Sequence, residues 1–450
     1  MIIKKFKNCG LVPRFLFAFC LSNIKFLMRI KINMEKLRVH SGHKLFGSLK
    51  VCSSKNAILP ILAGCVLCNG EITLLNIPNF SDINKMCEIL KSLGCIVNYF
   101  NGVLHINSKN VDRFLVENSL SKDIRASIVF LGALLGRMKR CVIGQPGGCL
   151  IGNRPIDLHI QGLKALGANI YEEHGYLYCN GENMRPCTFK FEKQSVGATQ
   201  NLILASVLLK GKTTLKNCAK EPEVVDLVNF LKSMGAKVSG AGTGTITIYG
   251  VDELHSTIYL PIGDRIVAGT YLTACAITGG NVEICNINPN HLSSVLKKLS
   301  FCGCQLCIKN DKIKLLANQR CKSLKSITTG VFPKFPTDMQ SIFLSLMAIS
   351  KGKCVITEQL FDGRFKQVPD LIKMGAKIDT FCNMAVVTGV ENLSGADVSA
   401  TDLRAGAGLV LAGLKADGYT TIDNVQYIDR GYDHIENDLS ILGAEIERIT

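Results

Sequence analysis

Hydrophobic and polar positions repeat along this chain in units of about seventy residues. A short apolar signature around one glycine, placed between an amphipathic helix and an apolar strand, recurs six times. Its glycines are Gly94, Gly167, Gly235, Gly303, Gly375 and Gly443, spaced 73, 68, 68, 72 and 68 residues apart. Glycine at this place lets the chain turn left-handed out of a helix. Because self-similarity at a fixed period marks repeated supersecondary units, we predict six equivalent modules.

Each module also contains a helix that is apolar almost all round, followed by a glycine turn and a β-branched strand. Residues 201–216 and 341–356 are examples. Such a helix is typical of a buried position. We therefore predict a mixed α/β fold of βαβ-type modules, each with one buried and one exposed helix. Two domains of three modules with an active site between them fit this pattern better than a solenoid, which needs polar capping repeats.

The composition is that of a folded, enzyme-sized protein. Of the 450 residues, 47% are hydrophobic and 20% are charged, which is too apolar for a disordered chain. The net charge of +16 would suit a nucleic-acid partner. However, the Lys and Arg residues are dispersed and form no basic motif interleaved with aromatic residues, so we expect no nucleic-acid binding. A positive active site for anionic substrates explains part of the excess charge.

Twenty cysteines predict reduced thiols rather than disulfides. The chain is long, the spacings are irregular and many cysteines stand in apolar runs, which is typical of small hydrophobic residues in a cytoplasmic protein. The pairs Cys65/Cys68 and Cys304/Cys307 lack a second pair or histidines at zinc-binding spacing. We interpret both pairs as packing residues and expect no metal.

The first 33 residues differ from the rest of the chain. They contain seven Lys or Arg residues, no Asp or Glu, and one apolar run, Phe15–Leu21, that is too short to span a bilayer. A signal or transit peptide would need a small-residue cleavage site, and none is evident. We interpret residues 1–33 as an N-terminal extension and expect the folded protein to begin near Met34. No later stretch has the length of a membrane span.

Residues 145–159 have the strongest chemical signal. Their glycines and prolines favour a loop, with Cys149 in its middle and Arg154 five residues further on. A thiol beside fixed positive charge has a lowered pKa and is reactive. Asp157 and His159 follow on a segment that we expect to re-enter a helix. His159 fits a functional group and a buried, hydrogen-bonded side chain equally well.

Charged and polar residues also stand near the starts of several predicted buried helices. Helix N-termini bind anions through free N–H groups and the helix dipole, so basic residues at these junctions predict a pocket for highly anionic substrates. These residues are Lys55, Asn56, Arg125, Asp338, Asp402, Arg404 and, on a later loop, Arg430.

Together these motifs resemble the UDP-N-acetylglucosamine 1-carboxyvinyltransferase family, the enolpyruvyl transferases of peptidoglycan synthesis. The similarity runs from about Met34 to the C-terminus. It rests on the pair Lys55-Asn56, the cysteine loop from Pro146 to Pro155, and the motifs Phe335-Pro-Thr-Asp-Met-Gln340, Asp402-Leu-Arg404 and Asp429-Arg-Gly-Tyr432. The sister family of the shikimate pathway is similar in fold but lacks the cysteine loop.

The resemblance implies two domains, each built from three βαβαββ units with buried helices and outer sheets. It assigns residues 55–262 to domain one, and residues 34–54 together with residues 263–450 to domain two. The N-terminal strand would thus belong to the C-terminal domain. No metal and no organic cofactor are implied.

The resemblance also implies a reaction: the enolpyruvyl group of phosphoenolpyruvate moves to the 3′-hydroxyl of UDP-N-acetylglucosamine and phosphate is released. Cys149 matches the acid that protonates C3 of phosphoenolpyruvate and that also forms a covalent adduct. Asp338 matches the base for the sugar hydroxyl. Retention of Cys149 predicts sensitivity to epoxides that alkylate this thiol.

Three cations, Lys55, Arg154 and Arg430, match ligands of the phosphate and carboxylate of phosphoenolpyruvate, because such groups bind these anions strongly. Arg404 and Asp402 are expected nearby, where Asp402 acts in catalysis or instead orients Arg404 or the base.

Contacts to the nucleotide sugar carry over to a larger set. Its members are Asn56, Arg125, Arg154, Pro155, Ile156, Asp157, Leu158, Lys193, Gln194, Ser195, Val196 and Leu360. Gln194 departs from the small apolar residues common at its position, which puts the nucleotide affinity in doubt but removes no catalytic group. Two alternatives stay open: the shikimate-pathway sister reaction, and a catalytically idle paralogue that binds nucleotide sugar.

Overall fold

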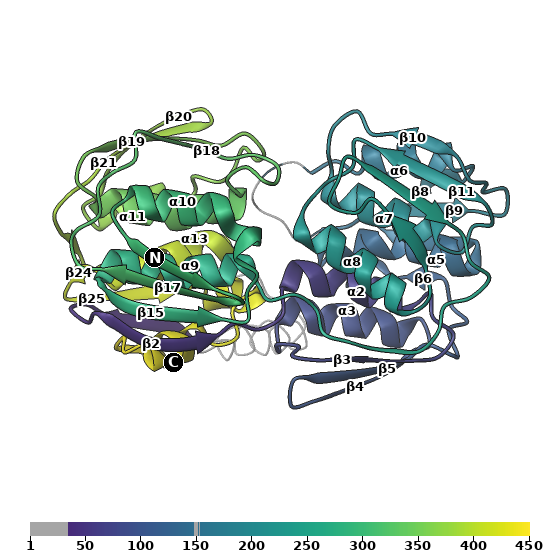
Figure 1. Cartoon of the computed structure of the whole chain (residues 1–450), viewed down its shortest axis with the longest axis horizontal. Helices are drawn as coiled ribbons and strands as arrows, with labels where there is room; N and C mark the ends of the chain where they lie inside the picture. The colour runs from purple at the N-terminus through teal and green to yellow at the C-terminus, as the bar shows by residue number, and fades with distance from the viewer. Residues whose placement is uncertain (1–34, 148–151, 153) are drawn as a thin grey trace, which may run out of the picture.

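The computed structural model describes residues 35–147, 152 and 154–450, which form two lobes lying side by side (Figure 1). Each lobe has three modules, and each module has one long apolar helix whose side chains are almost all buried, as the sequence pattern predicted. These helices are α2 (Lys55–Cys65), α5 (Phe130–Met138), α7 (Val196–Ser206), α9 (Arg265–Thr278), α11 (Gln340–Ile349) and α13 (Leu403–Gly413).

A second, amphipathic helix in each module ends just before one of the six repeated glycines. These helices are α3 (Ser81–Ser92), α6 (Asp157–Ala165), α8 (Pro222–Ser233), α10 (Ser293–Phe301), α12 (Val368–Lys373) and α14 (Ile435–Ile441). All six glycines have φ between 93° and 102°. The repeated glycine is therefore explained by a left-handed turn that residues with a Cβ rarely adopt.

Six four-stranded sheets cover the outside of the lobes, and all six have one topology: a parallel pair at one edge, followed by two antiparallel pairs. In one lobe their orders are β14 (Thr257–Tyr259)–β3 (Glu71–Leu74)–β5 (Val103–Asn107)–β4 (Ile96–Phe100), β6 (Leu115–Val116)–β7 (Arg140–Gly144)–β9 (Tyr176–Asn180)–β8 (Asn169–Glu173) and β10 (Thr188–Lys190)–β11 (Lys212–Lys216)–β13 (Thr245–Tyr249)–β12 (Lys237–Ser239). In the other they are β2 (Leu45–Lys50)–β15 (Gly280–Cys285)–β17 (Lys312–Ala317)–β16 (Gln305–Lys309), β18 (Ser326–Thr328)–β19 (Lys353–Thr357)–β21 (Met384–Thr388)–β20 (Lys377–Phe381) and β23 (Asp397–Ser399)–β25 (Tyr419–Asp423)–β1 (Lys36–His40)–β26 (Ile446–Ile449).

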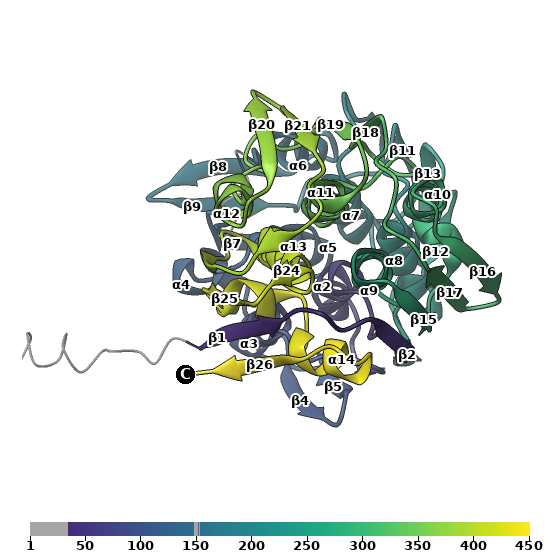
Figure 2. The same cartoon turned by 90° about the vertical axis from the view of Figure 1, so that its left-hand side faces the viewer.

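The N-terminal strands complete the C-terminal lobe. Strand β1 pairs with β25 and β26, and β2 pairs with β15, so β1 and the C-terminal β26 lie together (Figure 2). In the other lobe the late strand β14 pairs with β3 of the first module. Each lobe is thus closed by a strand that lies far away in the sequence.

The chain passes between the lobes in two adjacent segments. Ser53 and Gly263 form an antiparallel bridge, the Ser54 amide donates to the Ile262 carbonyl at 2.7 Å, and the Asp264 amide donates to the Cys52 carbonyl at 3.0 Å. The two connections therefore act as one short ribbon. Helices α2 and α9 begin directly after it.

Each lobe has its own hydrophobic core. One core contains buried residues between Ile58 and Leu254, and the other combines Leu37–Val51 with residues from Ile266 to Ile446. We propose on this basis that the domain bounds are residues 55–262 for domain one, and 34–54 plus 263–450 for domain two. Residues 1–33, the expected N-terminal extension, lie outside the described residues.

One interpretation of the cysteine pairs was wrong. Cys65, Cys68 and Cys304 are buried, but Cys307 is exposed because it lies on the outer face of β16. Over the described ranges, no group of His, Cys, Asp and Glu side chains is arranged to hold a metal ion. Within the same part of the chain, every helix is too short or too polar to cross a bilayer.

Gly132→Ala tests how closely the buried helices pack. A Cβ at Gly132 in α5 would lie 2.1 Å from the backbone oxygen of Asn201 and 2.3 Å from its Oδ1 in α7. Because the backbone cannot yield easily, we expect the free energy of unfolding to fall by about 1–3 kcal/mol in urea denaturation. Gly244→Ala is the control, since its Cβ would meet only a lysine carbon at 3.9 Å. Equal stabilities of the two variants would contradict this packing.

Candidate active site

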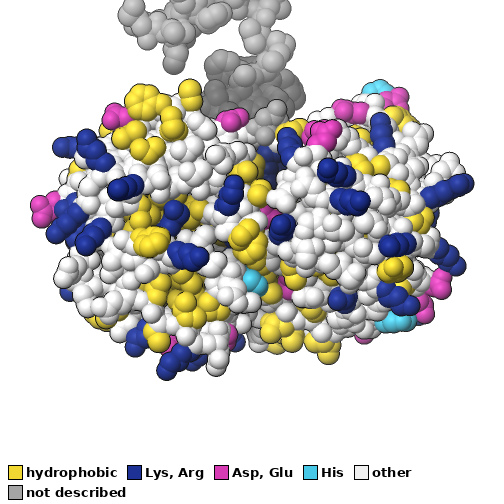
Figure 3. All heavy atoms as spheres, turned by 45° about the horizontal axis from the view of Figure 1, so that its top comes forward, with side chains coloured by type: hydrophobic (Ala, Val, Ile, Leu, Met, Phe, Trp, Pro, Cys, Tyr) yellow, Lys and Arg dark blue, Asp and Glu magenta, His cyan; other side chains and the backbone are white. Residues whose placement is uncertain are grey.

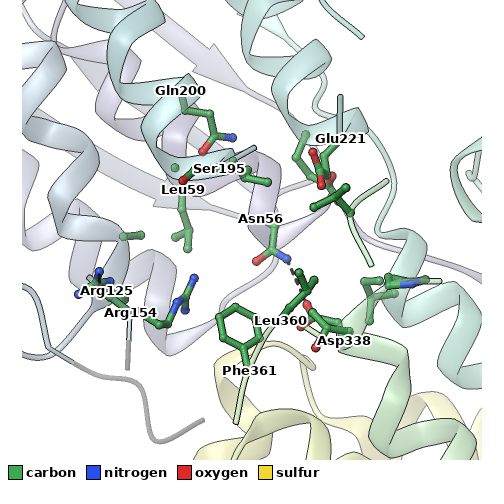
Figure 4. Close-up of a pocket in the computed structure, with 18 of the residues that line it drawn as sticks. Asn56, Leu59, Arg125, Arg154, Ser195, Gln200, Glu221, Asp338, Leu360 and Phe361 are labelled. Atoms are coloured by element: carbon green, nitrogen blue, oxygen red, sulfur yellow. Dashed lines mark hydrogen bonds between the residues drawn. The ribbon is translucent and has the colours of Figure 1, made fainter. Parts of the chain in front are cut away.

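A cavity of about 670 Å³ lies between the two lobes. Residues from the start of all six buried helices line it: Lys55 at α2, Arg125 before α5, Ser195 at α7, Arg265 at α9, Asp338 before α11 and Asp402 at α13. The repeat therefore directs one helix start from each module into a single cavity. Figure 4 shows several of these side chains converging on it.

Most of the predicted site residues line this cavity. They are Lys55, Asn56, Arg125, Arg154, Pro155, Asp157, Leu158, Lys193, Gln194, Ser195, Val196, Asp338, Leu360, Asp402, Arg404 and Arg430. Ile156 is not among the lining residues and packs against the hydrophobic core of its own lobe. Cys149 lies outside the described residues.

Asp82 joins cations of the two lobes and was not singled out from the sequence. It is buried at the start of α3 (3% exposed) and lines the cavity. Its Oδ2 accepts a hydrogen bond from Lys55 Nζ at 3.0 Å, and its Oδ1 accepts one from Arg430 Nε at 2.9 Å. Burial raises the pKa of Asp82, but the charges of Lys55 and Arg430 outweigh burial and lower it. The carboxylate is therefore ionised between two cations.

Asp338 is held in the same way by two arginines of its own lobe. Arg364 Nη2 donates to its Oδ1 at 2.5 Å and Arg404 Nη2 donates to its Oδ2 at 3.4 Å. Asn56 of the other lobe donates to Oδ2 at 3.5 Å (Figure 4). Burial raises the pKa of Asp338, but Arg404, Arg364 and Lys55 together hold it well below its usual range. Arg364, which is 3% exposed, was also missed in the sequence.

Asp402 caps helix α13. Its Oδ1 accepts hydrogen bonds from the backbone amides of Arg404 at 3.0 Å and Ala405 at 3.1 Å, which is the usual role of an N-cap aspartate. Arg404 is held further by Tyr432, whose hydroxyl accepts from Nη1 at 3.2 Å. The arrangement supports the alternative that Asp402 orients Arg404.

Arg125 binds backbone at both ends of the cysteine loop. Its guanidinium donates to the Pro146 carbonyl at 3.5 Å, to the Pro155 carbonyl at 3.4 Å, and to the carbonyl of Arg154. The Arg154 guanidinium lies 5.0 Å from the centre of the Phe361 ring of the other lobe, and Figure 4 shows the two side chains next to each other. Arg125 and Phe361 thus fix the described ends of this segment against the cavity.

The second predicted nucleotide segment begins helix α7. Ser195 caps this helix through a hydrogen bond from the Ala198 amide at 3.4 Å. Gln194 donates to the Cys218 carbonyl at 3.2 Å, so its polar side chain has a partner in its own lobe. Lys193 is exposed and lines the cavity.

His159 is a buried, hydrogen-bonded histidine. It lies in α6, the helix expected after the cysteine loop, and its Nδ1 is 2.9 Å from Asn201 Nδ2. Burial first, and then the charges of Arg125 and Arg154, lower its pKa to about 3. His159 is therefore neutral near pH 7, and it also lines the cavity.

Lys and Arg side chains spread over both lobes and form no single patch in the view of Figure 3. This agrees with the dispersed distribution of basic residues in the sequence. A cluster of cations lies inside the cavity instead. There Lys55, Arg364, Arg404 and Arg430 pair with the carboxylates of Asp82 and Asp338.

Comparison with known proteins identifies the fold. Residues 39–439 match the family described as EPSP synthase (3-phosphoshikimate 1-carboxyvinyltransferase). The solved structure of the enolpyruvyl transferase NikO from Streptomyces tendae is similar with a TM-score of 0.82 and 23% identity, over 93% of this chain and 99% of that one. An EPSP synthase from Acinetobacter baumannii has a TM-score of 0.70 and 16% identity, over 92% and 100% of the two chains. The predicted two-domain enolpyruvyl-transferase fold is confirmed.

Two relatives are more similar in sequence. UDP-N-acetylglucosamine 1-carboxyvinyltransferase 2 of Caldanaerobacter subterraneus subsp. tengcongensis is 44% identical over 416 residues, which are 92% of this chain and 100% of that protein. UDP-N-acetylglucosamine 1-carboxyvinyltransferase of Ruthia magnifica is 44% identical over 417 residues, with the same coverage. The chain belongs to the EPSP synthase family of enolpyruvyl transferases.

The neutral state of His159 predicts a pH dependence of stability. Its pKa in the folded protein, about 3, is below the ordinary histidine value of 6.5, so the unfolded chain binds a proton first as the pH falls. The contribution of His159 is thus complete above pH 6.5 and is lost progressively toward pH 3. We expect the free energy of unfolding to fall more between pH 7 and 4.5 in the wild type than in His159→Gln, measured by urea denaturation. Identical falls would contradict a neutral, buried His159.

Proposed function

We propose that this protein is an enolpyruvyl transferase that uses phosphoenolpyruvate and UDP-N-acetylglucosamine and releases phosphate. One observation carries the proposal: cations and carboxylates from all six modules meet in one cavity. The chain is 44% identical, over 92% of its length, to two transferases named for this reaction. The shikimate-pathway reaction has less support, because the EPSP synthase structures share only 16–17% identity with this chain.

The proposed phosphoenolpyruvate subsite lies around Lys55 and Arg430, with Arg154 and Arg404 next to it. Ammonium and guanidinium groups form strong, charge-assisted hydrogen bonds with phosphate and carboxylate. A subsite made from both lobes would hold the substrate only when the lobes are together, which also excludes water from the reaction.

The nucleotide sugar is proposed to lie along the residues from Arg154 to Leu158 and from Lys193 to Val196, with Asn56 and Leu360 nearby. These segments border the cavity on the side of domain one, where the α7 start offers free backbone N–H groups. The sugar 3′-hydroxyl would then face Asp338.

Asp338 is proposed as the base. As the O3′–C2 bond forms, the proton of the sugar hydroxyl moves to Asp338 and C3 of phosphoenolpyruvate receives a proton from Cys149. In the second step the tetrahedral intermediate returns a C3 proton to the Cys149 thiolate as the C2–O bond to phosphate breaks, which restores the C2–C3 double bond. The proton held by Asp338 leaves with the phosphate, so both residues regain their starting states. The lowered pKa of Asp338 makes it a weak base while Arg364 and Arg404 hold it. A substrate anion that binds Arg404 would raise the basicity of Asp338.

A cytoplasmic location is proposed on the state of the thiols. All described cysteines are free, and most are buried, as expected in a reducing compartment.

The proposal is tested first by phosphate release. We expect phosphate from phosphoenolpyruvate only when UDP-N-acetylglucosamine is also present. Release with shikimate 3-phosphate instead would favour the sister reaction, and no release despite nucleotide-sugar binding would indicate an idle paralogue.

Asp338→Asn should lose most of this activity, because the amide cannot accept the hydroxyl proton. We expect kcat to fall by about 10²–10⁴-fold, while calorimetry shows binding of UDP-N-acetylglucosamine within about tenfold of the wild type. A kcat near the wild-type value would exclude Asp338 as the base.

Cys149→Ala should abolish sensitivity to thiol-alkylating epoxides as well as turnover. We expect the wild type to gain one epoxide adduct, located at Cys149 by peptide mass spectrometry. Cys307→Ala, which removes an exposed thiol on β16, should remain alkylated and inactivated. Modification of other cysteines with Cys149 intact would contradict its reactivity.

A further inference from the structure

The pair of cations proposed to bind phosphoenolpyruvate already has an anion. Lys55 from one lobe and Arg430 from the other share the buried carboxylate of Asp82, at 3.0 and 2.9 Å. This leaves the subsite with two positive charges and one negative charge, a net +1 for these three side chains. The Asp82 carboxylate lies between the two cations, at the position where they would otherwise attract an oxyanion of the substrate.

We infer that Asp82 is an internal counter-anion that sets how tightly the phosphoenolpyruvate subsite holds a phosphate group, in the substrate and in the released product. This inference rests on the proposed function, since it takes Lys55 and Arg430 as ligands of phosphoenolpyruvate.

The physical reason is the strength of charges in a buried site. In a partly buried site, two cations that face a phosphate dianion with no counter-charge bind it more strongly than they would in open water. Tight binding that is equal for substrate, transition state and product lowers KM without raising kcat, and it slows product release. A fixed carboxylate weakens phosphate binding while keeping both cations aligned. Asp82 can therefore favour turnover over simple anion capture.

The position of Asp82 at the start of α3 favours its negative charge. Asp82 is in the first turn of α3, where the helix dipole favours a negative side chain. Just before this helix, the Asn79 amide donates to Asp433 Oδ2 of the other lobe at 3.3 Å. Asp433 thus belongs to the same junction between the lobes, but it does not line the cavity.

Asp433 provides a matched control. Asp82→Asn and Asp433→Asn each remove one negative charge from the same inter-lobe junction, and only Asp82→Asn removes the partner of Lys55 and Arg430. The measurement is binding of inorganic phosphate to the full-length protein by isothermal titration calorimetry, with turnover of the wild type and variants assayed in parallel.

We expect Asp82→Asn to bind phosphate about tenfold more tightly than the wild type, with stronger product inhibition by phosphate and a lower kcat. Asp433→Asn should bind phosphate as the wild type does. Asp82→Glu retains the charge and should stay within about threefold of wild-type affinity. If Asp82→Asn does not fold, Asp82→Ala takes its place, and the same tightening is expected because a phosphate oxygen can fill the space.

Phosphate affinity that is unchanged or weaker without the Asp82 carboxylate would overturn this role and leave Asp82 as a purely positioning residue. That result is distinct from failure of the proposed function, which would appear as absence of turnover in the wild type with both substrates. Tightened phosphate binding in a protein without that turnover would still identify Asp82 as the counter-anion of an anion site.

Discussion

The structure depends on balancing buried charge between two lobes. Four cations, Lys55, Arg364, Arg404 and Arg430, meet in one cavity, and each is paired with Asp82 or Asp338. A buried charge is costly unless it is paired and hydrogen-bonded. Because the Arg430–Asp82 pair crosses between the lobes, the same interactions that neutralise the cavity also hold the lobes together. Arg265 and Glu223, paired at 2.8 Å across the junction, add a further buried ion pair.

The internal repeat explains why these groups can meet at all. Each module buries one apolar helix, so the start of that helix is the place where polar side chains can reach an internal cavity without disturbing the core. Three modules per lobe bring three such helix starts to one face, and the two faces oppose each other. Strands distant in the sequence close each lobe, β1 and β2 in one and β14 in the other. The ribbon around Ser53 and Gly263 connects the two lobes.

Much of this could be predicted from the sequence. The repeat is visible in the sequence because each of the six glycines makes a left-handed turn that most other residues cannot adopt. The residues Lys55, Arg125, Asp338 and Arg404 were then found from their positions near the starts of the buried helices within this repeat. The cavity brings them together. Their individual chemical roles remain predictions.

Other features could not be read from the sequence. Asp82 stands on an amphipathic helix where an acidic residue in the first turn is ordinary, and only the approach of Arg430, 348 residues away, gives it significance. Arg364 lies outside every repeated junction. The exposure of Cys307 depends on which face of β16 points outward, and a Cys-x-x-Cys spacing does not determine that.

The proposed active site is tested most directly by a crystal structure of the full-length protein with UDP-N-acetylglucosamine and phosphoenolpyruvate, using Asp338→Asn to prevent turnover. We expect the sugar 3′-hydroxyl within hydrogen-bond distance of residue 338, and the phosphate of phosphoenolpyruvate in contact with Lys55 and Arg430. Ligands bound elsewhere, or a phosphate that contacts neither cation, would contradict it.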